Sequence, residues 1–418
     1  MFRFIHAADL HLDSPLQGLE LHEGAPVNVL RGATRRAFEN LVNLALEEGV
    51  DFLVIAGDIY DGDWKDYNTA LFFRSQMVRL NDRGIPVYLI SGNHDAASVI
   101  SKKLVLPENV HAFSTRAAES MEVEGIPAVI HGRGFPNRAV PENLAVEYPS
   151  AVLGKFNIGL LHTSLTGLLG HDTYAPCSEQ DLRAKGYDYW ALGHIHQPEV
   201  ISTAPWIVFP GNCQGRHIRE RGSRGCQFVT VNDGLEVESA ERRILDVVRW
   251  AVVEVDLSKV ERESEALQCI RAALGVQIER EEGRLVAARV CLAGATSLHG
   301  ELHKNSQHWR AQLHAIAQDF GEESLWIERM SIGTTPLYDV AQLAERDALT
   351  GTVLKALEQA THALHQLPAD ILEMLDVLPP ELRSEVERDW EESQRDQLMG
   401  EVRAIILEAL KTKGETTK

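Results

Sequence analysis

The sequence contains no apolar run of about 18 residues, the length that a membrane-spanning helix needs. Its N-terminus reaches the charged Asp9 too early to contain the apolar core of a signal peptide. The phosphate-binding loop G-x-x-x-x-G-K-[S/T] of nucleotide hydrolases is also missing. We therefore expect a cytoplasmic protein that makes no membrane contact and does not hydrolyse ATP itself.

Cysteine is scarce, with five residues in a chain of 418, and no two of them form a C-x-x-C pair. The odd number and the scattered positions argue against a disulfide framework and against a thiolate zinc site. We expect free thiols, which suits a reducing compartment.

Basic residues are the minority among the charges, with 41 Lys and Arg against 61 Asp and Glu and a net charge of −20. A chain with this balance is repelled overall by nucleic acids and anionic membranes. Any contact with a nucleic acid must therefore use a local basic surface or bound metal cations.

Patterns of strands and helices divide the chain into three regions. Residues 1–244 alternate short apolar runs with amphipathic helices, which predicts a layered α/β domain with polar residues at the strand ends. Residues 245–340 show a β-α-β-α-β order, as in a small α/β domain. Residues 341–418 contain only helical patterns, broken by Pro368 and by Pro379-Pro380.

Histidine is abundant, with 17 residues. Several of them belong to five polar clusters that follow strand-like runs in the order D-x-H, G-D, G-N-H-D, H-T and G-H-x-H. Side chains alternate along an extended chain, so D-x-H and H-x-H each place two ligands on one side. One such cluster is an ordinary turn, but five in order at strand ends are not produced by chance. The residues are Asp9, His11, Asp58, Asn93, His94, Asp95, His162, His194 and His196.

The remaining histidines of this region lie outside the series, and we expect ordinary structural roles for them. They are His6, His22, His111, His131 and His171.

The donor types in the clusters predict metal ions. Imidazole, carboxylate and amide oxygen, without thiolate, suit Mn²⁺, Fe or Zn²⁺ better than Cu(I) or an iron–sulfur cluster. Seven such donors suit two ions that share one carboxylate, and two divalent ions leave a net positive charge that suits a phosphate diester. A metal pair can lower the pKa of a bound water and hold both the attacking and the leaving oxygens.

The ordered series resembles the calcineurin-like metallophosphoesterase superfamily over about residues 1–240. The resemblance implies a sandwich of two β-sheets flanked by helices, with a two-metal centre. It assigns Asp9, His11, Asp58 and His196 to one metal, and Asp58, Asn93, His162 and His194 to the other, with Asp58 bridging. It also makes His94 the residue that contacts the phosphate and protonates the leaving oxygen, oriented by Asp61.

The residues around Asp61 indicate a branch of the superfamily. Protein Ser/Thr phosphatases follow this Asp with a phosphate-binding Arg, whereas Gly62 stands here, and archaeal and eukaryotic repair nucleases have a second His in place of Asp61. The segments F-I-H-A-A-D-L-H-L-D-S-P-L, A-G-D-I-Y-D and Y-D-Y-W-A-L-G-H-I-H resemble bacterial DNA repair exonucleases of the SbcD/YhaO type.

That resemblance implies a DNA exonuclease or endonuclease subunit that uses two divalent ions, with Mn²⁺ expected and Fe or Zn²⁺ as alternatives. It also implies that a small α/β capping domain follows the nuclease domain. C-terminal helices would then dock on the coiled-coil root of an SMC-like ABC ATPase.

A basic stretch, R-H-I-R-E-R-G-S-R at residues 216–224, follows the last metal-ligand motif and is a candidate contact for DNA phosphates. Its proposed contact residues are Arg216, His217, Arg219 and Arg221. The alternative is a solvated loop with local salt bridges.

Two other functions stay open: a small-nucleotide phosphodiesterase or pyrophosphatase, and a DNA-end-binding scaffold for the ATPase. Whether the chain forms a homodimer also stays open. Apolar residues of the terminal helices should face the ATPase, or else pack on the chain's own second domain. They are Val353, Leu357, Leu364, Ile371, Leu375, Leu378, Leu398, Val402 and Ile405.

Overall fold

The computed structural model describes residues 1–14, 25–61, 67–97, 105–165, 174–363 and 392–415, apart from 341, 343, 344 and 346. The chain forms two compact units. One unit contains residues 1–251 and 281–287, and the other contains residues 252–280 and 288–418. The terminal helices belong to the second unit, whereas the sequence pattern predicts a separate helical region for residues 341–418. The boundaries at 244 and 340 stay predictions.

Two six-stranded sheets form the framework of the first unit. The first sheet has the order β12-β11-β1-β2-β3-β4, in which β1 to β4 run parallel and β11 and β12 are antiparallel to their neighbours. Its strands are β1 (Phe2–Ala7), β2 (Phe52–Ile55), β3 (Val87–Leu89), β4 (Val110–Ala112), β11 (Gly225–Val231) and β12 (Val237–Ile244).

The second sheet has the order β5-β6-β7-β8-β10-β9. Strands β6, β7, β8 and β10 run parallel, and the edge strands β5 and β9 are antiparallel to their neighbours. Its strands are β5 (Glu119–Glu122), β6 (Ala128–Gly132), β7 (Phe156–His162), β8 (Tyr189–Gly193), β9 (Glu199–Thr203) and β10 (Trp206–Phe209).

The alternation of side chains in β1 explains how the layers pack. Phe4 faces the core between the two sheets, where its ring stacks on that of Phe52 with centroids 5.0 Å apart. Ile5 faces the other way and packs in the core below the helices. The helices of that layer are α1 (Val27–Arg31), α2 (Ala33–Glu48) and α3 (Tyr67–Asn81).

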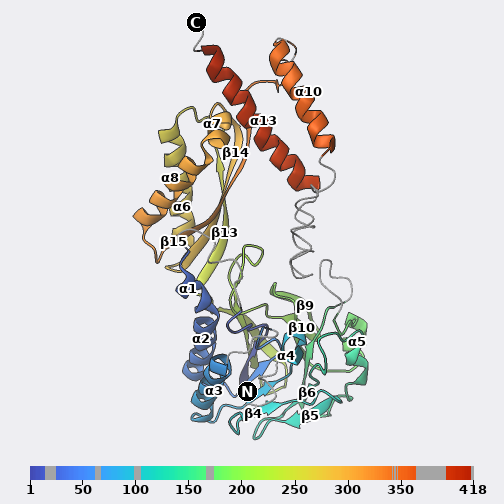
Figure 1. Ribbon diagram of the computed structural model, residues 1–418. Coiled ribbons are helices and arrows are strands. Elements are labelled where there is room, and N and C mark those ends of the chain that lie inside the picture. The colour runs from blue at the N-terminus through green and yellow to red at the C-terminus, as the bar shows by residue number, and fades with distance from the viewer. Residues whose placement is uncertain are drawn as a thin grey trace. The chain divides into compact units, whose positions relative to one another are not determined.

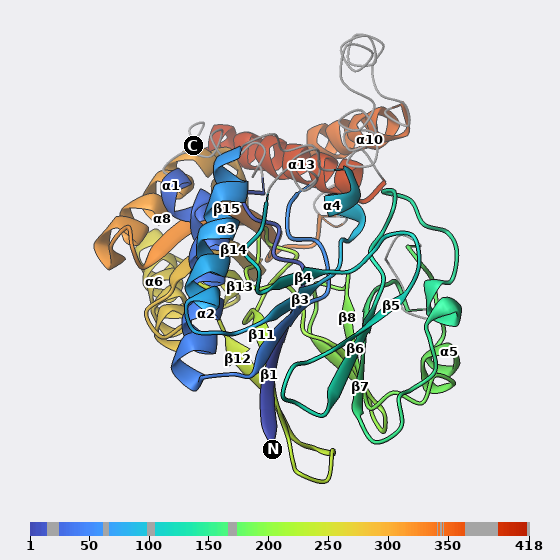
Figure 2. The same cartoon turned by 90° about the horizontal axis from the view of Figure 1, so that it is seen from below.

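Figure 2 shows α2 and α3 on one side of the strands β1 and β3, with β6 and β7 of the second sheet on the other side. The outer face of the second sheet packs on η2 (Leu144–Glu147) and α5 (Glu179–Arg183), where Trp190 is fully buried. The predicted fold class, two sheets flanked by helices, is confirmed. Gly32 separates α1 from α2.

A three-stranded sheet of order β13-β14-β15, with bounds Val248–Asp256, Leu285–Thr296 and Leu325–Pro336, lies mostly in the second unit, while the first residues of β13 and β14 belong to the first. Between and after these strands come α6 (Glu263–Arg280), α7 (His299–Lys304), α8 (Ser306–Phe320), α10 (Ala348–Ala363) and α13 (Glu392–Glu415). The helix α8 lies against the sheet and buries Trp309 and Leu313 (Figure 1). None of the described helices is both long and apolar enough to cross a membrane.

The polar clusters found in the sequence stand at the carboxyl ends of parallel strands from both sheets. Asp9 follows β1, Asp58 follows β2, and Asn93 begins the short helix α4 (Asn93–Ala97) after β3. His162 is the last residue of β7, and His194 follows β8. This edge is where open α/β sheets place their ligand sites.

Candidate metal centre

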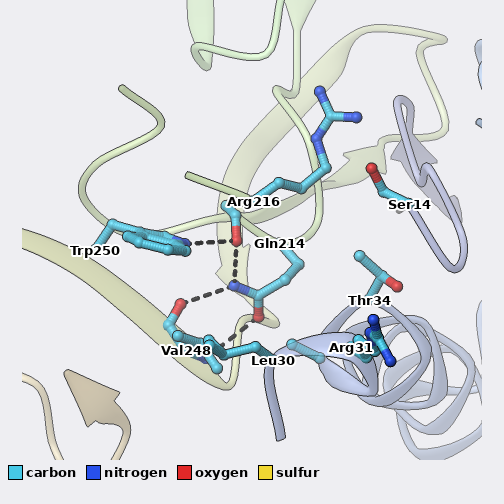
Figure 3. Close-up of a pocket in the computed structure, with 10 residues that line it drawn as sticks. Ser14, Leu30, Arg31, Thr34, Gln214, Arg216, Val248 and Trp250 are labelled. Carbon is cyan, nitrogen blue, oxygen red and sulfur yellow. Dashed lines mark hydrogen bonds between the residues drawn. The ribbon is translucent and has the colours of Figure 1, made fainter. Parts of the chain in front are cut away.

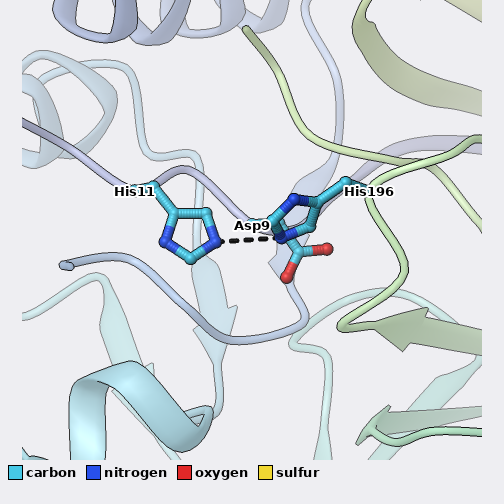
Figure 4. Close-up of side chains that lie close together, drawn as sticks. All are labelled: Asp9, His11 and His196. Carbon is cyan, nitrogen blue, oxygen red and sulfur yellow. Dashed lines mark hydrogen bonds between the residues drawn. The ribbon is translucent and has the colours of Figure 1, made fainter. Parts of the chain in front are cut away.

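The side chains of Asp9, His11 and His196 form the first of two histidine-carboxylate groups. One donor atom from each lies within 4.8 Å of the others. The Nε2 atoms of His11 and His196 face each other at 3.1 Å (Figure 4). Two nitrogens bound to one ion at about 2.0–2.1 Å are themselves about 2.8–3.0 Å apart in octahedral geometry and about 3.3–3.4 Å apart in tetrahedral geometry. The pair therefore has the spacing of two ligands of a single ion.

The second group contains Asp58, Asn93 and His162. The Nε2 atom of His162 lies 2.9 Å from Oδ1 of Asn93 and 3.4 Å from Oδ2 of Asp58. The same Oδ2 atom of Asp58 lies 3.8 Å from Nε2 of His11 in the first group. Asp58 thus lies between the two histidines, which is the place of a carboxylate shared by two ions.

His194 joins the site through both its ring and its backbone. Its ring lies against that of His162, with centroids 5.3 Å apart. Its backbone N–H donates to both carboxylate oxygens of Asp9, at 3.0 and 3.1 Å. This contact ties the end of β8 to the end of β1, so the two sheets meet at the site.

Four of the predicted ligands have backbone conformations that side-chain-bearing residues rarely adopt. Their φ angles are positive: 52° for Asp9, 42° for His11, 52° for Asp58 and 98° for His194. Each such residue costs about 1–3 kcal/mol, and strain of this kind persists at functional sites where the surroundings hold it. The turns after the strands therefore aim these side chains at one point.

Glycines of the motifs allow the close approach. A Cβ atom at Gly92 would lie 2.2 Å from Oδ1 of Asp58, and one at Gly193 would lie 2.0 Å from the carbonyl oxygen of Ala56. The glycines of G-N-H-D and G-H-x-H therefore leave room for the bridging carboxylate and for the crossing of the two sheets.

Hydrogen bonds orient His162 for metal binding. Its Nδ1–H donates to the carbonyl oxygen of Ala56 at 2.9 Å, which directs Nε2 toward Asp58 and Asn93. Without an ion, Nε2 carries a hydrogen that Oδ1 of Asn93 accepts, and an ion would replace this hydrogen. A second hydrogen bond of this kind fixes the tautomer of metal-binding histidines. The donor set, its spacing and its orientation thus fit two divalent ions.

Burial and neighbouring charges set the protonation of the site in the absence of cations. Burial lowers the pKa of His11 to about 3, so this ring is neutral. Burial alone would lower the pKa of His162 as well, but the Asp58 carboxylate raises it to about 9. Burial likewise acts to raise the pKa of Asp58, yet His162 and His11 hold it well below its usual range.

His94 and Asp61 form a separate pair beside the ligands. Nδ1 of His94 lies 2.9 Å from Oδ1 of Asp61, whose other oxygen accepts a 2.5 Å hydrogen bond from Ser14. Burial acts to lower the pKa of His94, but the hydrogen bond to Asp61 raises it above its usual value. This arrangement favours the protonated form of the partly exposed His94, which is the form that its predicted role needs.

Comparisons with known proteins agree with this geometry. The model of the calcineurin-like phosphoesterase family matches residues 2–198, and the model of the middle domain of metallophosphoesterase YhaO matches residues 250–335. An uncharacterized metallophosphoesterase YhaO of Bacillus subtilis is 38% identical over 296 residues, which cover 70% of this chain and 71% of that protein. The chain belongs to the YhaO family of calcineurin-like metallophosphoesterases. It is therefore a phosphoester hydrolase of a family that uses divalent metals.

More distant similarity extends to archaeal proteins. The DNA double-strand break repair protein Mre11 of Methanopyrus kandleri is 26% identical over 233 residues, covering 50% of this chain and 48% of that protein. Mre11 of Thermoplasma acidophilum is 25% identical over 258 residues, covering 56% of this chain and 66% of that protein. This chain thus spans about half to two thirds of these two relatives.

The basic stretch after the last ligand is only partly exposed in this metallophosphoesterase. Arg224 is buried, and its guanidinium donates to the carbonyl oxygen of His196. The side chain of Arg216 is 15% exposed and faces Glu220 and Asp61. His217, Arg219 and Arg221 are exposed. These three residues are the surface part of the predicted DNA contact.

Glu220 is a functional candidate that the sequence pattern does not predict. Its buried carboxylate accepts a 2.7 Å hydrogen bond from Nδ1 of His196. In the sequence it is one acid inside a basic stretch, and no spacing relates it to His196. A lone acid among basic residues next to a ligand motif is the one signal that points to it.

The histidines expected to have structural roles divide into described and undescribed residues. His6 is buried and bonds to Tyr189 and to the carbonyl of Leu192, while His131 bonds to Ser120 and Asn157. His22 and His171 lie outside the described residues.

Metal binding should release a proton from His162. With a pKa of about 9 this ring is protonated at neutral pH in the metal-free protein, and a ligand must be neutral. We expect Mn²⁺ affinity to rise by up to about tenfold per pH unit between about pH 6.5 and 8.5. Calorimetric titration in two buffers of different ionisation enthalpy measures the proton number. An affinity that does not change over this interval would contradict the assignment of His162.

Proposed function

We propose that this metallophosphoesterase is a DNA nuclease that hydrolyses phosphodiester bonds at DNA ends during repair, with Mn²⁺ as the expected metal. The carrying observation is the position of Asp58 between the two histidine groups, next to the His94–Asp61 pair. The archaeal relatives named as DNA double-strand break repair proteins support DNA as the substrate.

Two divalent ions would supply an activated water and positive charge opposite the phosphate. The residues that would hold them are Asp9, His11, Asp58, Asn93, His162, His194 and His196. The chain itself supplies the proton for the departing oxygen. Because Nδ1 of His94 faces Asp61, its Nε2–H is left to donate to that oxygen.

The nuclease proposal is tested by supplying purified protein and Mn²⁺ with linear duplex DNA, single-stranded DNA and a small chromogenic phosphodiester. Asp58→Asn should abolish cleavage of all three and reduce the bound metal, because it neutralises the carboxylate between the two groups. His94→Ala should retain about two ions per chain and lower kcat by about 10²–10⁴-fold. Asp61→Asn should cause a smaller fall, since it only orients His94.

Each other outcome has a definite meaning. A His94→Ala protein that loses its metal would make His94 a ligand, which its place within 4.8 Å of His11 and Asp58 would allow. Cleavage of the small diester without any DNA cleavage would favour the small-nucleotide phosphodiesterase. DNA binding by a metal-loaded protein that cuts nothing would favour the scaffold.

The exposed basic residues should contribute to the binding of DNA but not to the hydrolysis of the small diester. We expect Arg219→Gln with Arg221→Gln to weaken DNA binding and to reduce the slope of log K against log [salt] by about 0.9 for each lost phosphate contact. Turnover of the small diester should not change. The exposed Arg116 and Arg138, changed to Gln together, form a charge-matched control. An equal loss in both double variants would trace the effect to net charge and contradict a specific contact.

We also propose that the second unit binds the coiled-coil root of an SMC-like ABC ATPase through the free faces of α10 and α13. The helix α13 buries Ala404 and Leu407, while Leu398 and Ile405 on another face are 41% and 40% exposed. On α10, which contacts α13, Leu349 is 60% exposed. The other apolar residues that were expected to face the ATPase fall into two sets. Val353, Leu357 and Val402 are half-buried, and Leu364, Ile371, Leu375 and Leu378 lie outside the described residues.

Charged residues on this face should disrupt the partnership selectively. We expect Leu398→Asp with Ile405→Asp to abolish co-purification with the ATPase, while metal content and diester turnover stay at the wild-type level. Arg403→Asp, at an exposed position of the same helix, is the control. A double variant that still binds the ATPase would place the interface elsewhere. A loss of self-association instead, seen by sedimentation, would assign the face to a homodimer.

A further inference from the structure

Glu220 makes an unusually complete set of hydrogen bonds next to the metal centre. One carboxylate oxygen accepts from Nδ1 of His196 at 2.7 Å. The other accepts from the backbone N–H of Arg216 at 2.8 Å and from the side-chain amide of Asn212 at 2.9 Å. The residue is 6% exposed, and His196 and Arg216 keep its pKa well below the usual range despite its burial.

These contacts determine which nitrogen of His196 faces the centre. An ionised carboxylate only accepts hydrogen bonds, so Nδ1 of His196 carries the hydrogen in the 2.7 Å bond to Glu220. The guanidinium of Arg216 lies 3.3 Å from the same Nδ1, and because it too can only donate, it contacts this atom without a hydrogen bond. Nε2, the atom that faces His11 at 3.1 Å, is then the nitrogen with the lone pair. With the opposite tautomer, an N–H group would point to the place where the first group would hold an ion.

The loop that carries Glu220 is itself held firmly. The side chain of Gln214 donates to the carbonyl of Val248 at 2.8 Å and accepts from its N–H at 3.2 Å. The indole of Trp250 donates to the carbonyl of Gly215 at 3.0 Å. Figure 3 shows these bonds at a small pocket of the first unit. In this view the Arg216 side chain extends away from Gln214, and Ser14 lies on the same side of the pocket.

The guanidinium of Arg216 links the two functional halves of the centre. It lies 3.2 Å from Oε1 of Glu220 and 3.6 Å from Oδ2 of Asp61. Glu220 orients the ligand His196, and Asp61 orients His94. The guanidinium of Arg216 therefore contacts the carboxylate partners of both His196 and His94.

We propose that Glu220 and Arg216 are positioning residues of the metal centre, an inference that rests on the proposed function of that centre. Glu220 fixes the tautomer and orientation of His196. Arg216 holds Glu220 and Asp61 in place, and this role, rather than contact with DNA, accounts for its position. A partner that orients a metal-binding histidine typically changes metal affinity by about 10–100-fold when it is removed.

The first experiment measures the tautomer of His196 in the metal-free full-length protein. Long-range ¹⁵N–¹H spectra of histidine-labelled protein report the tautomer of each ring, and the signals missing in His196→Asn identify His196. The wild type should show the hydrogen on Nδ1. Glu220→Gln, which removes the charge but keeps the shape, should produce a mixture of tautomers. An unchanged Nδ1–H form in Glu220→Gln would overturn the proposal.

The second experiment titrates the same proteins with Mn²⁺, followed by calorimetry and by electron paramagnetic resonance. Glu220→Gln should weaken one of two sites by about 10–100-fold and leave the other unchanged. Arg216→Gln should weaken the same site less. Glu241→Gln, at an exposed position on β12, is the matched control and should bind as the wild type does.

The remaining outcomes separate the possible failures. Equal weakening of both sites with a lowered melting temperature would make Glu220 a general structural residue and overturn the proposal. Arg216→Gln with unchanged metal affinity but a raised KM for DNA would make Arg216 a DNA contact and overturn its positioning role. A wild-type protein that binds no pair of ions would contradict the proposed function, whereas the tautomer of His196 would still test the role of Glu220.

Discussion

The buried carboxylate of Asp58 is the group on which the rest of the site depends. It lies between His11, carried by the end of one sheet, and His162, at the end of the other. A buried anion is costly unless cations or hydrogen-bond donors compensate it. Here the backbone N–H of His94 donates to Oδ1 of Asp58 at 2.9 Å. The His162 ring, whose pKa is raised to about 9, carries a positive charge beside it. The surroundings of Asp58 are therefore those of a site built to receive cations. The positive φ of Asp58 directs its side chain to this place, and Gly92 leaves room for its carboxylate.

The junction of two sheets explains why the centre can be rigid. Each sheet contributes ligands from the carboxyl ends of its parallel strands, and the hydrogen bonds from His194 to Asp9 join the two edges. The core between the sheets, with Phe4 stacked on Phe52, fixes their spacing below the site. Ions bound by residues from both sheets would stabilise this junction further, since a ligand that binds only the folded state adds to its stability. Metal binding and the packing of the sandwich are thus linked.

The sequence predicted the fold class and the gathering of the ligands because both are encoded locally. A buried strand followed at once by D-x-H or G-H-x-H places its donors at the strand end without knowledge of distant contacts. The short strands β4 and β5 lack the continuous apolar run that marks a buried strand in a sequence, since β4 is mostly half-buried and β5 is largely exposed. Glu220 escaped because only the folded loop brings it to His196. The burial of Arg216 and Arg224 could not be read from a charge count, which treats every arginine as a surface residue.

The distribution of charge around the centre gives the order in which its ligands must bind. Four carboxylates lie in or beside the centre, those of Asp9, Asp58, Asp61 and Glu220, and Arg216 contacts two of them, Asp61 and Glu220, in a chain with a net charge of −20. Without added cations, these carboxylates oppose the approach of a phosphate diester, and the positive charges of His162 and Arg216 offset them only in part. Two divalent ions would reverse the local sign, because bound cations are the largest charges in such centres. On this balance of charge we expect metal loading to precede binding of the phosphate, and the proposed anchoring of His196 by Glu220 would contribute through the metal that it helps to hold.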